Sequence, residues 1–275
     1  MIFKLRLFSK ILILFGLTQL VGIFAARRFL PEFAVIRPGR VSDLSLYDLA
    51  VLAAFVFLFI FLVKRFRRFS SVFFKFFLTL VAFAGTQAIL ALWLPPAASV
   101  WVAILLLVLF WFLNNVFLQD LVMLLTFAGV GAIFGLSLAP EAAVLVLAAL
   151  SFYDIIAVYK TKHMVELAET MIRSRAIFGF VVPGSFDGFK ERMTNVSPGE
   201  QFMILGSGDL ILPLLLSASL ARTSVVQSAV VALFSVAGLF LMHLIFTNQK
   251  VRRPMAALPP IAMMEILGYL VIFLV

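Results

Sequence analysis

Long apolar stretches alternate with short polar breaks along almost the whole chain, and each stretch is long enough to cross a lipid bilayer. A membrane-spanning helix needs about 20 mostly apolar residues, because each residue adds about 1.5 Å across a core about 30 Å thick. Prolines, arginine clusters and polar runs mark the breaks and predict nine spans. Their predicted limits are 7–26, 46–63, 72–94, 97–115, 119–138, 142–160, 201–221, 225–246 and 257–275.

The weakest break lies between the fourth and fifth predicted spans. Only four polar residues interrupt the apolar run there: Asn114, Asn115, Gln119 and Asp120. An eight-span alternative, in which these two spans are one, therefore stays open.

The composition agrees with a membrane protein. Hydrophobic residues make up 64% of the 275 residues and charged residues only 13%, whereas a soluble domain carries about a quarter charged residues. We therefore predict an all-α, polytopic integral membrane protein of the cell membrane, in which residues 1–275 form a single membrane-embedded domain. The chain has no Cys, which excludes disulfides, thiolate metal sites and a cysteine nucleophile.

Basic residues are distributed unevenly between the two sides of this arrangement. If the N-terminus is cytoplasmic, all but five of the 22 Lys and Arg residues fall on the cytoplasmic side. Cytoplasmic loops carry such an excess, so we predict a cytoplasmic N-terminus, a C-terminus outside and a cytoplasmic loop over 161–200. The net charge of +9 then reflects topology and contact with the anionic lipid bilayer, and we expect no nucleic-acid partner.

Three acidic residues fall inside predicted spans: Asp154 in the sixth, Asp209 in the seventh and Glu265 in the ninth. An ionisable side chain in a span is costly to insert, so each is a candidate functional residue. Asp154 lies shortly before Lys160 and Asp209 shortly after Glu200, which puts both acids at a similar depth from the same face. Because these two spans are antiparallel neighbours, we expect the two carboxylates to face each other.

Two carboxylates close together in a region of low dielectric constant resist ionising together, so the pair tends to hold one shared proton. This is the chemistry of an aspartic protease. One ionised Asp takes a proton from water, while its protonated partner hydrogen-bonds to the scissile amide and then protonates it. The mechanism needs no metal or other cofactor. Two alternatives remain, namely a pair that serves packing only and a proton- or cation-coupled transporter.

The residues around these acids favour close approach and a broken helix. Gly206 and Gly208 precede Asp209, where the missing Cβ lets a neighbouring helix or an extended substrate come near. Three prolines disturb the start of the ninth span: Pro254, Pro259 and Pro260. Non-helical backbone at membrane depth is tolerated where it lines protein or a wet cavity, so we expect a cavity wall here.

Three short motifs occur in order in the sixth, seventh and ninth spans: Tyr153-Asp154, Gly206-Ser207-Gly208-Asp209 and Ala257-Leu258-Pro259. Together they resemble the Y-D, G-x-G-D and P-A-L signatures of the presenilin and signal peptide peptidase family of intramembrane aspartyl proteases. One departure is that Ala256 replaces the first proline of P-A-L, which bears on the local backbone path. The orientation and the small size are similar to those of a microbial, in particular an archaeal, presenilin homologue.

The resemblance implies that Asp154 and Asp209 are the two catalytic residues. It also implies residues that shape the site or bind substrate: Tyr153, Gly206, Gly208, Ala257, Leu258 and Pro259. The Tyr153 hydroxyl would bond a carboxylate or the substrate, although a packing aromatic fits equally well. The implied enzyme is an intramembrane aspartic endopeptidase that cleaves transmembrane helices of membrane proteins or signal-peptide remnants, with no obligatory accessory subunit. The transporter remains the alternative.

The cytoplasmic loop carries two further patterns. Apolar residues at helical spacing over 164–172 predict an amphipathic helix at the membrane surface. Residues 176–182 are apolar and partly β-branched, and we hypothesise that they offer a strand edge to an unwound substrate. The alternative is an ordinary interfacial linker.

Glu265 and a few nucleophile or ligand candidates lie outside these motifs. Glu265 would line the site, contact Arg222 or Gln87, or face a wet cavity. Ser207 and the two histidines match neither a serine-protease nor a metalloprotease pattern, so we expect no metal site.

Overall fold

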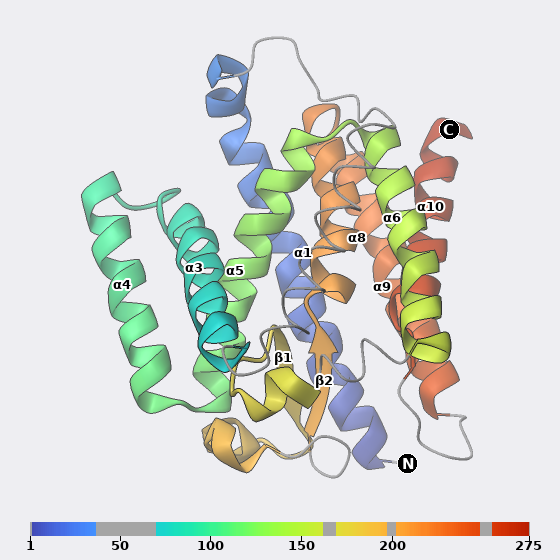
Figure 1. Cartoon of the computed structure of the whole chain (residues 1–275). Coiled ribbons are helices and arrows are strands. Elements are labelled where there is room, and N and C mark those ends of the chain that lie inside the picture. Colours follow the sequence, from blue (N-terminus) through green and yellow to red (C-terminus); the bar gives the residue numbers. More distant parts are fainter. Residues whose placement is uncertain (1, 37–69, 162–168, 197–201, 248–254, 275) are drawn as a thin grey trace.

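Helices make up most of the protein (Figure 1). The computed structural model describes residues 2–36, 70–161, 169–196, 202–247 and 255–274. The α-helices are α1 (Ile2–Ile36), α3 (Ser70–Leu90), α4 (Pro96–Leu113), α5 (Val116–Ser137), α6 (Pro140–Ile155), α8 (Gly208–Ser219), α9 (Val225–Thr247) and α10 (Leu258–Leu274). The shorter elements are a π-helical turn (Ile156–Lys160), three 3-10 turns (Asp187–Lys190, Met193–Asn195 and Leu220–Arg222) and the strands β1 (Gly179–Pro183) and β2 (Phe202–Gly206).

Six helices among the described residues are long and apolar enough to cross a membrane, and they coincide with predicted spans. These are α1, α3, α4, α5, α9 and α6 together with its π-helical turn. Helix α10 matches the ninth predicted span, and the second predicted span, 46–63, lies outside the described residues. Helices α4 and α5 are separate, because Asn114 takes a left-handed conformation and Asn115 caps the start of α5. The eight-span alternative is therefore wrong at this break.

Helix α1 extends further than the predicted limit of the first span. It continues to Ile36 with Pro31 inside it, although a proline removes an N–H and frees a carbonyl one turn earlier. Arg27, Arg28, Pro31 and Glu32 are exposed, so water can hydrate the freed carbonyl. The helix therefore tolerates this proline near its end.

The seventh predicted span is not one helix. Its first part is strand β2, and only the 12 residues of α8 are helical. Gly206, Ser207 and Gly208 favour a break, and pairing with β1 satisfies the strand backbone. The prediction of a helix over 201–221 and of an all-α fold is corrected at this point.

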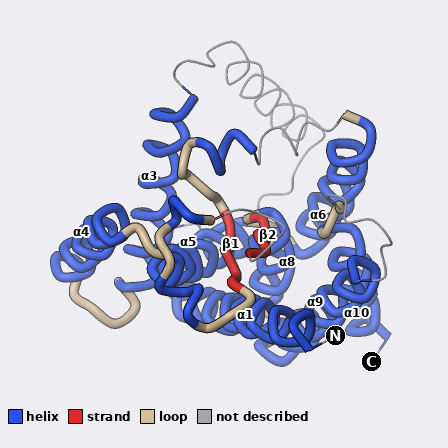
Figure 2. The backbone as a smooth tube through the Cα atoms, turned by 90° about the horizontal axis from the view of Figure 1, so that it is seen from below, coloured by secondary structure: helices blue, strands red, loops and turns tan. Residues whose placement is uncertain are grey.

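The two strands form a small antiparallel sheet near the centre of the helices (Figure 2). Their register runs from Gly179 opposite Gly206 to Pro183 opposite Phe202. A Cβ at Gly179 would collide with the carbonyl oxygen of Leu205, so the close pairing requires glycine there. Every residue of β1 is buried, and the hypothesis that residues 176–182 include a strand is confirmed for Gly179–Pro183.

The helices pack around this sheet in a way that brings distant segments together. Helix α5 lies in the middle and contacts α1, α3, α8 and β1, while α9 packs against α10 and α6 packs against α8 and α10. Helix α4 lies at the outer flank beside α3 (Figure 1). One hydrophobic core includes the sheet and fully buried phenylalanines from α1, α3, α5 and β1: Phe15, Phe74, Phe127 and Phe180. The acid-bearing helices α6, α8 and α10 are thus held side by side.

Candidate active site

Asp154 lies at the end of α6, where the helical hydrogen bonding changes. After Ile155 the chain forms a π-helical turn, in which the N–H of Thr161 donates to the carbonyl of Ile156 at 3.0 Å. Single π-helical turns inside helices occur frequently at functional sites. The change in winding directly follows the acid and was not predicted from the sequence.

Asp209 lies in the first turn of α8, immediately after β2. The backbone N–H groups of Leu210 and Ile211 donate to the carbonyl of Ser207, which closes this turn. The N–H of Gly206, the last residue of β2, interacts with the Asp209 carboxylate. The N-terminus of a helix carries a partial positive charge, which stabilises an anion in its first turn. Strand and helix therefore meet at the carboxylate.

The N-terminus of α10 faces Asp154 in a similar way. The backbone N–H of Leu258, the first residue of α10, interacts with the Asp154 carboxylate. Pro259 and Pro260 lie in the first turn of α10, where the missing N–H of a proline leaves no intrahelical hydrogen bond unmade. Residues 255–257 are not helical and Leu258 is buried. The sequence predicted that the prolines prevent a regular helix from starting around Ala257-Leu258. This is wrong for Leu258, where α10 begins.

The structure brings Asp154 and Asp209 together. The charge of Asp154 acts on Asp209, although the two residues lie on helices that are separated by the loop over 161–200. Both acids are half-buried, and Gly208 next to Asp209 is exposed. The buried oxygen Oδ2 of Asp154 has no hydrogen-bond partner among the described residues. The arrangement is a carboxylate pair that is accessible from one side and supported by two backbone N–H groups.

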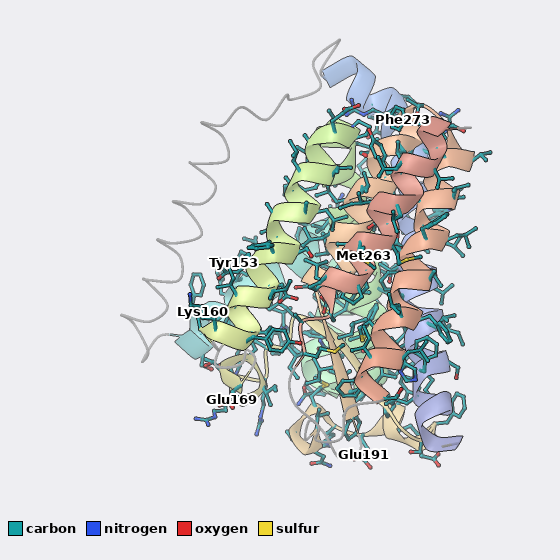
Figure 3. The ribbon with its side chains drawn as sticks, turned by 90° about the vertical axis from the view of Figure 1, so that its right-hand side faces the viewer. Tyr153, Lys160, Glu169, Glu191, Met263 and Phe273 are labelled. Atoms are coloured by element: carbon teal, nitrogen blue, oxygen red, sulfur yellow. The ribbon has the colours of Figure 1, made fainter. Side chains whose placement is uncertain are left out.

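The other predicted site residues divide into two groups. Leu258 and Gly206 contact the acids through their backbones, and a Cβ at Gly208 would meet open space among the described residues. Tyr153 lies on α6 with 38% of its surface exposed (Figure 3). Among the described residues it makes no hydrogen bond to either aspartate. The structure therefore does not assign its hydroxyl to the carboxylate pair.

Glu265 has a different environment from the one expected. It is 0% exposed, and its Oε1 accepts a hydrogen bond of 3.0 Å from the Ser217 hydroxyl. Gln87, one expected partner, bonds to Ser99 instead. Glu265 lies two turns beyond Leu258 along α10, about 10 Å further from the end of the bundle that holds the sheet. The expected contacts with Arg222 or Gln87 are wrong, and the carboxylate is set apart from the aspartates.

Two polar residues that interrupt the apolar run between the fourth and fifth predicted spans lie on α5 and bond to the sheet. Oδ1 of Asp120 accepts the N–H of Val181 at 2.8 Å, and Nε2 of Gln119 donates to the carbonyls of Ile177 at 2.8 Å and Gly179 at 3.3 Å. The signal for them was Asn115, whose side chain caps α5 by accepting the N–H of Leu118. An Asn cap at this point starts the helix earlier and puts both residues inside it.

No metal centre is apparent in the part of the chain that the structure describes. Groups of three or more His, Asp or Glu side chains that could hold a metal ion do not occur among the described residues.

Two carboxylates that interact inside a bundle of apolar helices are the groups that the chemistry of an aspartyl protease requires. A profile of the family described as "Signal-peptide peptidase, presenilin aspartyl protease" matches residues 14–275, and the chain belongs to this family. It is an integral membrane protein and an intramembrane aspartyl protease of the presenilin type.

Solved structures give the same result. Two structures of a presenilin family intramembrane aspartate protease, in the C222 and P2 space groups, are similar to this chain with TM-scores of 0.61 and 0.62. Their sequence identities are 27% and 28%, and each comparison covers 94% of both chains. The comparison with curated proteins found no match.

Proposed function

We propose that Asp154 and Asp209 are the catalytic pair of this protease, which is then of the G-x-G-D type. The observation that carries the proposal is that two half-buried acids from separate helices interact through their charges, each beside a backbone N–H. A pair in this environment holds one shared proton, which gives one acid and one base at the same time.

The proposed reaction uses this shared proton. The ionised carboxylate removes a proton from water, whose oxygen attacks the scissile carbonyl carbon. The protonated carboxyl hydrogen-bonds to the carbonyl oxygen and then supplies the proton that leaves with the amine. The N–H groups of Leu258 and Gly206 stabilise whichever carboxylate is charged. Water reaches the pair from the exposed side, at Gly208.

The proposed substrates are transmembrane helices of membrane proteins or signal-peptide remnants. A helix hides its peptide groups, so the segment to be cut must unwind and can then pair with a strand edge. We expected this edge on residues 176–182. The outer edge of β1 already bonds to Gln119 and Asp120, so we propose the outer edge of β2, which leads directly to Asp209.

The proposed topology is nine spans with a cytoplasmic N-terminus and a C-terminus outside, in a single domain without an obligatory accessory subunit. The distribution of Lys and Arg supports it. Helix α1 begins at the end of the bundle that holds the sheet and α10 ends at the opposite end (Figure 1), as an odd number of spans requires. The sheet and the acids then lie towards the cytoplasm.

The transporter alternative receives no support from the comparisons, since the family and the similar structures are proteases. A cleavage assay tests the proposal directly. Purified protein in detergent is mixed with a labelled single-span peptide, and Asp154→Asn and Asp209→Asn are compared with Asp187→Asn, an exposed loop control. We expect cleavage by the wild type and the control only; cleavage by either of the first two variants would reject the catalytic pair.

A further inference from the structure

The outer edge of β1 is closed by side chains from two helices. Moving along the edge, Gln119 bonds to the carbonyls of Ile177 and Gly179, and Asp120 accepts the N–H of Val181. At the far end of the strand, Nζ of Lys10 in α1 donates to the carbonyl of Pro183 at 2.8 Å. Every second residue of the strand is therefore held from outside the sheet.

These three side chains are almost fully buried. The exposed fractions are 2% for Gln119, 3% for Asp120 and 6% for Lys10. Burying an amide, a carboxylate and an ammonium group inside a membrane protein costs free energy that apolar residues would not. Packing alone therefore does not explain why polar side chains occupy these positions.

The residues next to β1 bond in turn to the segment that carries Asp209. Between the two carbonyls that Gln119 binds, the carbonyl of Phe178 accepts the N–H of Ser207 at 3.0 Å. Ser207 is the residue before α8, and its own carbonyl closes the first turn around Asp209. A path of hydrogen bonds thus runs from α5 through β1 to the start of α8. Displacement of β1 would move the turn that carries the acid.

We propose that Asp120 and Gln119 are positioning residues for Asp209. They anchor β1 to α5, so that the sheet and the Gly206–Gly208 turn are in place before substrate binds. They also occupy the β1 edge, so that a substrate strand would pair with the β2 edge. This inference rests on the proposed function of the aspartate pair and extends it to the elements that hold the pair.

The test compares removal of the anchor with its conservative replacement. Asp120→Leu removes the acceptor for Val181, whereas Asp120→Asn keeps an amide oxygen at the same position. We expect Asp120→Leu to lower kcat/KM about tenfold or more, in line with loss of a buried hydrogen bond. Asp120→Asn should retain most of the activity, which a residue that transfers protons would not.

A second readout separates positioning from a loss of fold. Mass spectrometry of the products shows which peptide bonds are cut, and a displaced β2 edge should spread cleavage over neighbouring bonds in Asp120→Leu and Gln119→Leu. Thr126→Val is a matched control, because Thr126 is a buried polar residue of the same helix that bonds to Thr86 and not to the sheet. It should leave both the cut position and the rate unchanged.

The outcomes are distinct from those of the catalytic proposal. If Asp120→Leu cuts the same bonds at the wild-type rate, or if Asp120→Asn is as inactive as Asp120→Leu, the positioning role is rejected while the aspartate pair stands. If Asp154→Asn still cleaves, the catalytic pair itself is rejected. If Asp120→Leu does not fold, hydrogen exchange of the β1 and β2 amides is measured in Asp120→Asn and Gln119→Leu instead. Protection in Gln119→Leu that equals the wild type would overturn the proposal.

Discussion

Helices α8 and α10 together form two polar regions. Each helix contributes one residue to each region, and the two regions lie about two helical turns apart. In the first region, Asp209 and the N–H of Leu258 face the site where Asp154 lies, and the acids are half-buried. In the second, Glu265 and Ser217 bond to each other inside regular helix and are sealed from solvent. Acidic side chains are thus half-buried and close to each other at helix ends, but enclosed in mid-helix. In this protein the accessible acids lie at helix N-termini: Asp209 is in the first turn of its own helix, and Asp154 faces the first residue of α10.

The largest expected effect distinguishes the two regions directly. Asp154→Asn or Asp209→Asn should lower kcat by roughly a thousandfold or more, because water then has no base or the amide no acid. Binding of a substrate peptide, measured by crosslinking, should persist. Residual turnover at a tenth of the wild-type rate would mean that another group performs the chemistry.

The second largest effect is expected from a substitution that changes the first region but leaves both of its acids in place. Gly179→Ala places a methyl group against the carbonyl of Leu205, which forces β1 and β2 apart and shifts the turn before Asp209. We expect kcat/KM to fall about tenfold, equivalent to about 1.4 kcal/mol, with a smaller change in melting temperature. Gly16→Ala, at a position in α1 where a Cβ meets nothing, serves as the control. Equal rates for both variants would show that the strand spacing is irrelevant to catalysis.

A smaller effect tests access to the first region. A Cβ at Gly208 meets no described atom, so Gly208→Ala should fold normally. If substrate passes close to this exposed backbone, the added methyl group should raise KM about threefold while the fold remains unchanged. A KM equal to that of the wild type would remove Gly208 from the substrate path.

The smallest effect belongs to the second region. Glu265→Gln keeps an oxygen that accepts the Ser217 hydroxyl, so cleavage should change less than about twofold. The same pair of assays, rate and melting temperature, checks this expectation. Loss of activity comparable to that of Asp209→Asn would make the two regions functionally equal and would contradict the comparison.

Hydrophobic patterning predicted most of the helices, because burial in lipid requires long apolar runs whatever their partners are. The pairing of Asp154 with Asp209 was predicted from a similar depth in two helical spans. That calculation used the rise of a helix for the residues before Asp209, where the structure has strand β2. Strand β2 was predicted as helix, since an apolar run of this length does not distinguish a buried strand from a helix. The strand conformation depends on pairing with β1, whose residues lie 19 to 27 positions earlier in the chain than their partners in β2.

The partners of the buried polar groups were the least predictable part. Asp120 interrupts an apolar run in the sequence and was taken only as a marker of the boundary between two spans, although it bonds to Val181. Glu265 lies in a helix as predicted, but it was given the wrong partners. Such contacts join residues that are far apart in sequence, so local patterns carry no information about them.

The shortness of α8 has a consequence for the lipid environment. Its 12 residues extend about 18 Å, well below the thickness of about 30 Å that a spanning helix crosses. Helices α1, α5 and α9 contact it, so this mismatch is met by protein and not by acyl chains. Bilayers of thinner or thicker lipids should then tilt the peripheral helices while the aspartates keep their depth relative to the sheet.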